Sequence, residues 1–379
     1  MIERNHLLRS VENALRTNPV VMLGGPRQSG KTTLARSLAQ RRGRAIHFDL
    51  EDPAVARVME EPMTTLKDLR GLVVIDEAQR SPQLFPVLRV LADRPRTPAR
   101  FLLLGSASPE LSRQSAESLA GRVAYIELTG FKTREVGMDK ADLLWLRGGF
   151  PRSFLARSAT ASMDWRNAFT RTFLERDLGI LGFGLSPKLM GRFWAMLAHY
   201  HGGLWNASEI GASLGVSYHT AAAYLDALEQ TYMVRRLLPW WENAGKRVVK
   251  RPKIYLRDSG LLHALLRIGS LRDLLLHPKL GASWEGFVME EVLDHFAPQD
   301  AYFYNVHAGS ELDLFFLHKG KRIGVEIKRE DAPRMTRSMH VAMADLQLDR
   351  LFVIYPGNLR YPLADQVECV PFSDLHTLN

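Results

Sequence analysis

The chain has 379 residues, 46% of them hydrophobic and 24% charged, which is ordinary for a soluble globular protein of two or three domains. Its single cysteine, Cys369, excludes intramolecular disulfides and cysteine-rich zinc sites. No apolar run approaches the ~20 residues that span a bilayer, and the charged start Met1–His6 lacks the apolar core of a signal peptide. We therefore expect a cytoplasmic protein with no membrane partner. The formal net charge of +9 favours a polyanionic partner.

The first third of the chain alternates apolar strand patterns with helical patterns. Such alternation predicts an α/β fold in which helices cover a parallel sheet. The expected strands are Val20–Leu23, Ala45–Asp49, Leu72–Ile75, Phe101–Leu104 and Val123–Leu128.

A complete phosphate-loop motif, Gly-x-x-x-x-Gly-Lys-Thr, follows the first of these strands. Glycines let backbone N–H groups point at phosphate oxygens, and the helix that follows adds the positive end of its dipole. Lys31 would then reach the β- and γ-phosphates, and the Thr32 hydroxyl would join the Mg²⁺ shell. Because no Asn-Lys-x-Asp segment that reads guanine is present, we expect the nucleotide to be ATP. The expected ATP contacts are Gly25, Pro26, Arg27, Gln28, Ser29, Gly30, Lys31, Thr32 and Thr33.

An acidic pair, Asp76-Glu77, ends the third strand, at the edge where parallel sheets place their ligands. Asp76 can hold the Mg²⁺ that Thr32 also touches, and Glu77 can orient and deprotonate a water aimed at the γ-phosphate. Acids also end strands simply because they are well solvated. Beside a complete phosphate loop, however, the pair favours hydrolysis over binding alone.

Two further residues are less specific. Ser106 lies in a small polar segment after the fourth strand, where it either senses the γ-phosphate or belongs to an ordinary strand-to-helix turn. Arg122 is either an arginine finger at an ATP site or a surface arginine. The sequence leaves both alternatives open.

Residues 131–200 read as mostly helical, and residues 204–256 read as helix, glycine turn, helix and hairpin, the outline of a winged helix-turn-helix. Ser217 is placed to cap the second helix, Tyr218–Gln230, which offers hardly any Lys or Arg for reading bases. The basic hairpin suits a grip on DNA phosphates that ignores sequence; the alternative is a protein–protein spacer. The expected nucleic-acid contacts are Lys246, Arg247, Lys250, Arg251 and Lys253.

The last hundred residues carry a second candidate site. Glu326 and Lys328 share one face of a strand, and Asp313 on the preceding strand can lie near Glu326 if the two pair as a hairpin. Such a group can hold Mg²⁺ at Asp313 and Glu326 and place a lysine beside an attacking water. In the helix Trp284–Phe296, Glu285 falls on the apolar face, where a carboxylate needs a partner. The alternative is a surface hairpin with solvated charges.

The ATP-site motifs resemble those of a known group. Residues 1–200 look like an AAA+ ATPase of the bacterial and archaeal type, on the loop Gly25–Thr32 and the strand end Val74–Gln79. The stretches Gly245–Leu262 and Trp284–Val288 resemble the C-terminal half of that group.

In that group the chain ends in a PD-(D/E)XK nuclease-like domain, whose core motif Asp313, Glu326 and Lys328 match. The resemblance implies an α/β ATPase domain with a helical lid (residues 1–200), a winged helix-turn-helix (201–270) and an α/β restriction-endonuclease-like domain (275–379). It also implies a homo-oligomer, such as a hexameric ring, in which a neighbour completes each ATP site.

Two functions follow as hypotheses. The first is an ATPase that binds DNA, with RNA as the alternative, and cleaves it with Mg²⁺ through Glu285, Asp313, Glu326 and Lys328. The second is a nucleotide-operated switch whose C-terminal domain binds DNA or protein and cleaves nothing.

Overall fold

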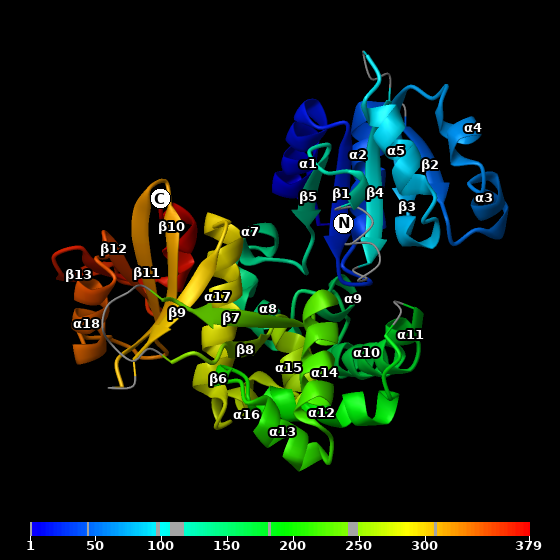
Figure 1. The fold of residues 1–379 in the computed structure, drawn as a ribbon. Coiled ribbons are helices and arrows are strands. Elements are labelled where there is room, and N and C mark those ends of the chain that lie inside the picture. The colour runs from blue at the N-terminus through cyan, green and yellow to red at the C-terminus, as the bar shows by residue number, and fades with distance from the viewer. Residues whose placement is uncertain are drawn as a thin grey trace.

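The computed structural model describes residues 2–43, 45–95, 99–106, 117–180, 183–241, 249–306 and 309–379. Its strands form two sheets, one in the N-terminal third and one that runs through the rest of the chain (Figure 1). Among the described helices, none is both long and apolar enough to cross a bilayer.

The first sheet is parallel and five-stranded, with the order β2-β3-β4-β1-β5. Its strands are β1 (Val20–Gly25), β2 (Ala45–Asp49), β3 (Gly71–Asp76), β4 (Ala99–Ser106) and β5 (Val123–Glu127). All five expected strands are confirmed, with small differences at their ends.

Helices cover both faces of this sheet, which explains why its central strands are continuously apolar. Leu7 of α1 (Asn5–Thr17) and Leu34 of α2 (Lys31–Arg42) share one core cluster with Val21 and Val74. On the other face α3 (Pro53–Val58), α4 (Pro62–Leu66), a 3₁₀ turn (Ala78–Arg80) and α5 (Leu84–Ala92) pack under the alternate strand residues. The phosphate loop and Asp76 therefore meet at the carboxyl edge of the sheet.

A helical segment leads from the first sheet to the second (Figure 1). It comprises α7 (Thr133–Val136), a 3₁₀ turn (Met138–Lys140), α8 (Ala141–Arg147), α9 (Pro151–Phe154), α10 (Ala159–Thr172), a π-helical turn (Phe173–Asp177) and α11 (Leu178–Ile180). This segment is mostly helical, as expected, but a π turn separates α10 from α11.

The next segment has the expected order of helix, turn, helix and hairpin. It comprises α12 (Pro187–His199), β6 (Gly203–Leu204), α13 (Ala207–Leu214), α14 (Tyr218–Gln230), β7 (Val234–Pro239), β8 (Lys253–Leu256), α15 (Ser259–Leu265) and α16 (Leu271–Leu275). The Ser217 side chain accepts from the Thr220 N–H, which confirms the predicted cap. Gly215 ends α13 with a left-handed φ of 72°.

The second sheet has nine strands in the order β13-β14-β12-β11-β10-β9-β7-β8-β6. The last part of the chain contains α17 (Leu280–Phe296), β9 (Ala301–Asn305), β10 (Glu311–His318), β11 (Lys321–Ile327), α18 (Arg337–Asp345), β12 (Arg350–Tyr355), β13 (Tyr361–Ala364), β14 (Val367–Pro371) and a 3₁₀ turn (Phe372–Thr377).

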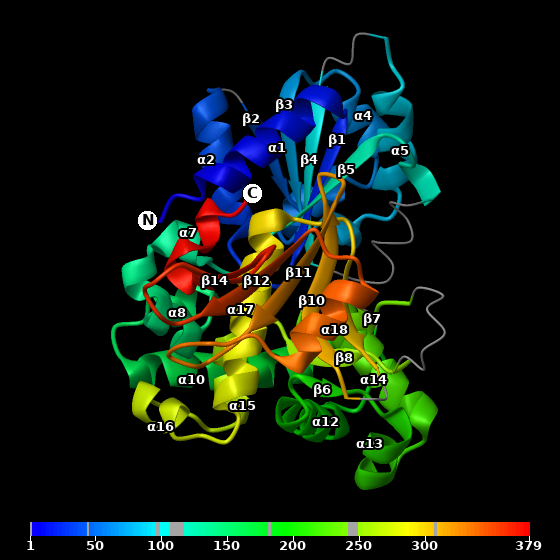
Figure 2. The same cartoon turned by 90° about the vertical axis from the view of Figure 1, so that its left-hand side faces the viewer.

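This sheet crosses the expected boundary near residue 270. β7 pairs with β9 in parallel, with Leu238 opposite Tyr302, so the segments expected as separate domains share backbone hydrogen bonds. Helix α17 lies along one face of the sheet (Figure 2) and shares a core cluster with Trp145 of α8. Helix α18 packs on the other face, where Cys369 is buried.

Candidate functional site

The phosphate loop joins the end of β1 to the start of α2 and depends on two glycines. Gly25 has a φ of 151°, and a Cβ at this position would lie 2.1 Å from the Leu128 carbonyl oxygen. Gly30 has a φ of 100°, in the region that other residues rarely adopt. A side chain would therefore clash with the backbone at Gly25 and strain the backbone conformation at Gly30.

Lys31 is buried inside this loop. Its Nζ donates to the carbonyl oxygens of Gly25, at 3.0 Å, and Pro26, at 2.8 Å. Burial lowers the pKa of Lys31 to about 8, although Glu77 and Asp76 act in the opposite direction. The ammonium is therefore already positioned within the loop that would surround the phosphates.

The two acids at the end of β3 face the same loop. The Thr32 hydroxyl donates to Asp76 Oδ2 at 2.7 Å, so the two oxygens expected to share Mg²⁺ are already adjacent. The Glu77 N–H donates to Asp76 Oδ1 at 3.0 Å, and Glu77 has a left-handed φ of 53°. Gln79 donates to the Glu77 carboxylate. Burial raises the pKa of Glu77 despite the nearby Lys31 and Arg27, which suits a proton acceptor.

These residues line a pocket of about 1010 Å³. The expected contacts Arg27, Gln28, Ser29, Gly30, Lys31, Thr32, Thr33, Asp76 and Glu77 all border it. The opposite wall includes Arg152 of α9 together with Arg176 and Asp177 of the π turn. Arg27 Nη1 donates to Asp177 Oδ1 at 2.9 Å and so joins the phosphate loop to the helical segment. The sequence did not indicate these lining residues because their segment reads as an ordinary helix, whereas π turns often mark functional sites.

Two weaker ATP-site predictions have different outcomes. Ser106 ends β4 and lies opposite Gly25 in the sheet register, but its side chain is outside the described part of the structure. Arg122 is at the other end of the sheet, where its carbonyl accepts from the Val20 N–H. Its guanidinium is half-buried and pairs with Asp93, so it does not reach the nucleotide pocket of its own chain. Its role as a finger towards a neighbouring subunit stays a prediction.

The structure brings the expected C-terminal residues together. Asp313 Oδ2 on β10 accepts from the Ile327 N–H on β11 at 2.8 Å, and Lys328 Nζ lies 2.7 Å from Glu326 Oε1. Burial and then the charge of Asp313 raise the pKa of Glu326 to about 8 and that of Glu285, on α17, to about 7. Glu326 Oε2 is buried and has no hydrogen-bond partner among the described residues.

Lys253, expected to contact nucleic acid, is instead buried in this cluster. Its Nζ lies 3.4 Å from Glu285 Oε1 and 3.7 Å from Asp313 Oδ1, and it also pairs with Glu311. The Tyr255 hydroxyl donates to Glu285 Oε1 at 2.5 Å. We define the carboxylate cluster as Glu285, Glu311, Asp313 and Glu326 with the ammonium groups of Lys253 and Lys328.

The metal position expected at Asp313 and Glu326 stays a prediction. Within the described ranges, no three His, Cys, Asp or Glu side chains are grouped closely enough to hold a metal ion. The ammonium of Lys253 lies among the carboxylates instead.

The other expected nucleic-acid contacts fall into two groups. Lys250 and Arg251 are described; Lys250 Nζ lies 5.7 Å from the centre of the exposed Trp241 ring, and Arg251 is exposed. Lys246 and Arg247 lie outside the described residues.

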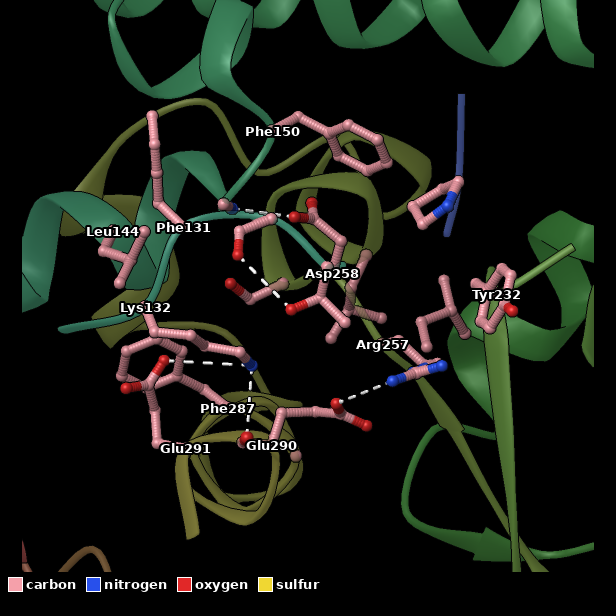
Figure 3. Close-up of a pocket in the computed structure, with 18 of the residues that line it drawn as sticks. Phe131, Lys132, Leu144, Phe150, Tyr232, Arg257, Asp258, Phe287, Glu290 and Glu291 are labelled. Atoms are coloured by element: carbon pink, nitrogen blue, oxygen red, sulfur yellow. Dashed lines mark hydrogen bonds and ion pairs between the residues drawn. The ribbon is translucent and has the colours of Figure 1, made fainter. Parts of the chain in front are cut away.

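A polar interface joins the nucleotide-binding sheet to α17. Glu127 of β5 lies opposite Gly24 of β1 and pairs with Arg257, which follows β8. Arg257 Nη2 also lies 3.5 Å from Glu290 Oε2 on α17 (Figure 3). A Cβ on Gly24 would lie 2.8 Å from the Tyr232 hydroxyl oxygen, so the turn after α14 touches the strand that enters the phosphate loop.

Buried charges on α17 complete this interface. Arg235 Nε lies 2.5 Å from Glu290 Oε1, and Lys132 Nζ donates to the Glu290 carbonyl at 3.1 Å. Burial alone would raise the pKa of Glu290, but Arg235 and Arg257 outweigh it and hold that pKa well below its ordinary value. On the next residue, Glu291 Oε2 accepts from the Thr133 N–H at 3.0 Å. Lys132, Glu290 and Glu291 line a small cavity of about 40 Å³ (Figure 3).

Three family models match the chain in succession. Residues 17–137 match "AAA domain", residues 138–272 match "Domain of unknown function (DUF8612)" and residues 280–375 match "Domain of unknown function (DUF4143)". Among solved structures, the Walker-type ATPase PABY2304 of Pyrococcus abyssi is 18% identical with a TM-score of 0.47, covering 70% of this chain and 96% of that chain. The Thermotoga maritima RuvB Holliday junction branch migration motor is 20% identical with a TM-score of 0.31, covering 62% and 90%.

Much closer in sequence is a mycobacterial protein. The "Uncharacterized protein Rv2008c" of Mycobacterium tuberculosis (strain ATCC 25618 / H37Rv) is 51% identical over 377 residues, covering 100% of this chain and 85% of the relative. The "Uncharacterized protein Mb2031c" of Mycobacterium bovis (strain ATCC BAA-935 / AF2122/97) has the same identity and coverage. Residues 17–137 therefore form an AAA domain, and the chain belongs to the family that contains these two mycobacterial proteins.

Proposed function

We propose that this AAA+ ATPase uses the binding and hydrolysis of ATP to control how its C-terminal part acts on nucleic acid. Lys31 holds the phosphates, Thr32 and Asp76 hold Mg²⁺, and Glu77 accepts a proton from the attacking water. The bound Mg²⁺ would neutralise charge on the phosphates. The Thr32 and Asp76 oxygens, which lie 2.7 Å apart, are oxygen ligands of the kind that Mg²⁺ prefers.

The observation that carries this proposal is the interface at Arg257. Glu127 is the register partner of Gly24, next to the phosphate loop, and Arg257 pairs with both Glu127 and Glu290. A shift of the loop on nucleotide binding acts on β5 and, through Arg257, on α17. This helix also carries Glu285 of the carboxylate cluster.

The net charge of +9 and the exposed loop residues Lys250 and Arg251 support a nucleic-acid partner. The order of elements from α12 to β8 supports a winged helix-turn-helix in this proposal. Helix α14 contains no Lys or Arg and exposes Tyr218 and His219 instead. The proposed contact is therefore with phosphates rather than with particular bases.

Two actions on the nucleic acid follow from the carboxylate cluster. Phosphodiester cleavage is supported by the meeting of Glu285, Asp313, Glu326 and Lys328. Binding without cleavage is supported by Lys253, whose ammonium takes the carboxylate oxygens that a metal would need. A plasmid assay separates them: cleavage that is lost in both Asp313→Ala and Lys328→Ala supports the first, and no cleavage with any metal supports the second.

We extend the proposal to a homo-oligomer in which Arg122 faces the ATP site of a neighbour. Light scattering with and without ATP gives the oligomeric state. If hydrolysis per subunit does not change with protein concentration, or Arg122→Ala hydrolyses ATP at the wild-type rate, this assembly is wrong.

The central proposal is tested by the linkage between the two ligands. Glu77→Gln should bind ATP without turnover, so its affinity for a fluorescent DNA duplex can be measured by anisotropy with and without ATP. We expect ATP to change this affinity by about 5–150-fold, the usual range of coupling between two sites. The matched variant Glu77→Gln/Arg257→Met should show a smaller change. DNA affinity that is independent of ATP in Glu77→Gln, while ATP is bound, contradicts the proposal.

A further inference from the structure

The Lys253 side chain is an unusual component of the carboxylate cluster. It belongs to β8, whose backbone pairs with Leu237 of β7 and Leu204 of β6, away from β10 and β11. Its ammonium nevertheless reaches Glu285, Glu311 and Asp313, and it lies 5.6 Å from the centre of the Phe303 ring. Only 4% of the residue is exposed.

This ammonium uses the oxygens that a divalent cation would require. Mg²⁺ and Mn²⁺ prefer carboxylate oxygens in a compact shell, and the lysine N–H donors are directed at the same atoms. A divalent ion placed among Glu285, Asp313 and Glu326 would also lie next to a fixed positive charge.

The cluster still contains more acidic than basic groups. Four carboxylates face two ammonium groups, and Glu326 Oε2 is buried without a hydrogen-bond partner among the described residues. Removal of the Lys253 ammonium would leave the carboxylate oxygens of Glu285, Glu311 and Asp313 without this cation. Carboxylate oxygens are the ligands that Mg²⁺ and Mn²⁺ prefer.

We infer that Lys253 is an internal cation that occupies the carboxylate cluster and competes with a divalent metal for it. The inference rests on the proposed role of the cluster in acting on phosphodiesters and adds how that site is regulated: the metal enters only when the Lys253 side chain leaves. Lys253 controls the affinity for the metal, which can be measured without any cleavage. A failure of the inference is therefore distinguishable from a failure of the proposed nuclease activity.

The test is a titration of the nucleotide-free protein with Mn²⁺, followed by electron paramagnetic resonance of the free ion. Lys253→Met keeps the length of the side chain and removes its charge, and we expect it to bind Mn²⁺ at least about tenfold more tightly than the wild type, a gain of about 1.4 kcal/mol. The charge-retaining control Lys253→Arg should bind as weakly as the wild type. Adding Asp313→Asn to Lys253→Met should remove the gain, which assigns the ion to the cluster and not to the phosphate loop.

Equal Mn²⁺ affinity of the wild type and folded Lys253→Met, whether tight or absent, overturns the inference. If Lys253→Met fails to fold, as judged by circular dichroism, Lys253→Gln takes its place with the same expectation. A third measurement needs no variant: acylation of lysines in the wild type, read by peptide mass spectrometry, should label Lys253 several-fold faster in saturating Mn²⁺. Unchanged labelling at that concentration overturns the inference as well.

Discussion

Arg257 offers the sharpest test of the interface between the nucleotide-binding sheet and α17. Its Nη2 lies 3.5 Å from Glu290 Oε2, and Glu290 is 5% exposed. At this distance, and with the effective dielectric of about 20 that suits such pairs, the attraction is about 5 kcal/mol before desolvation is counted. Loss of one member of a buried pair costs about 3–5 kcal/mol of folding free energy. Because Glu290 keeps Arg235 as a partner, we expect Arg257→Met to cost about 2–3 kcal/mol.

A matched variant separates the buried ion pair of Arg257 with Glu290 from its more exposed ion pair with Glu127. The Glu127 side chain is 43% exposed, so Glu127→Gln should cost less than about 1 kcal/mol. Urea unfolding at neutral pH, followed by tryptophan fluorescence, gives both values, and a double-mutant cycle with Glu290→Gln gives the coupling. A cost below about 0.5 kcal/mol for Arg257→Met, or purely additive effects with Glu290→Gln, would refute the assignment of Arg257 as the buried link.

Three further predictions concern other parts of the molecule. Glu77→Gln should bind ATP normally but lower the turnover number by about 10²–10⁴-fold, as measured by phosphate release; unchanged turnover would remove Glu77 as the proton acceptor. Burial lowers the pKa of His201 to about 3 and that of His263 to about 4, so both stay neutral when folded, whereas the unfolded chain protonates them below about pH 6.5. The free energy of unfolding should therefore be highest above that pH and fall on acidification, by about 1.4 kcal/mol per histidine at pH 5.5. The variant His263→Gln should make Tm depend less on pH. Charge reversal at Lys250 and Arg251 should weaken DNA binding similarly for all sequences and reduce its salt dependence; unchanged affinity would exclude this loop.

The ATP site was largely predictable because its signals are local. Gly25, Gly30 and Lys31 are close in sequence, and their geometry follows from one strand, one turn and one helix. Asp76 could be added because parallel strands bring their carboxyl ends to one edge. Asp177 could not, since its contact with Arg27 depends on how a segment 150 residues away folds back.

The carboxylate cluster could be predicted from the sequence only in part. The pairing of β10 with β11 follows from two alternating strands and a turn, so Asp313, Glu326 and Lys328 could be placed together. Lys253 lies in a run of basic residues, which suggests a solvated surface. Only the folding of β8 against α17 and β10 decides that this lysine points inward.

Helix α17 is buried on more than the apolar face on which Glu285 was expected. Glu290 and Glu291, which the apolar pattern does not include, are also buried. The Arg257, Arg235 and Lys132 side chains that bury them come from segments far away in sequence. Long-range ion pairs of this kind leave no periodic signal.

The most direct test of the account is steady-state phosphate release from ATP with Mg²⁺, measured for the wild type and for Lys31→Ala. Because Lys31 is held inside the phosphate loop, the account predicts turnover by the wild type and none above background for the folded variant. Equal rates for the two proteins, or a wild type that neither binds ATP in calorimetry nor hydrolyses it, would contradict it.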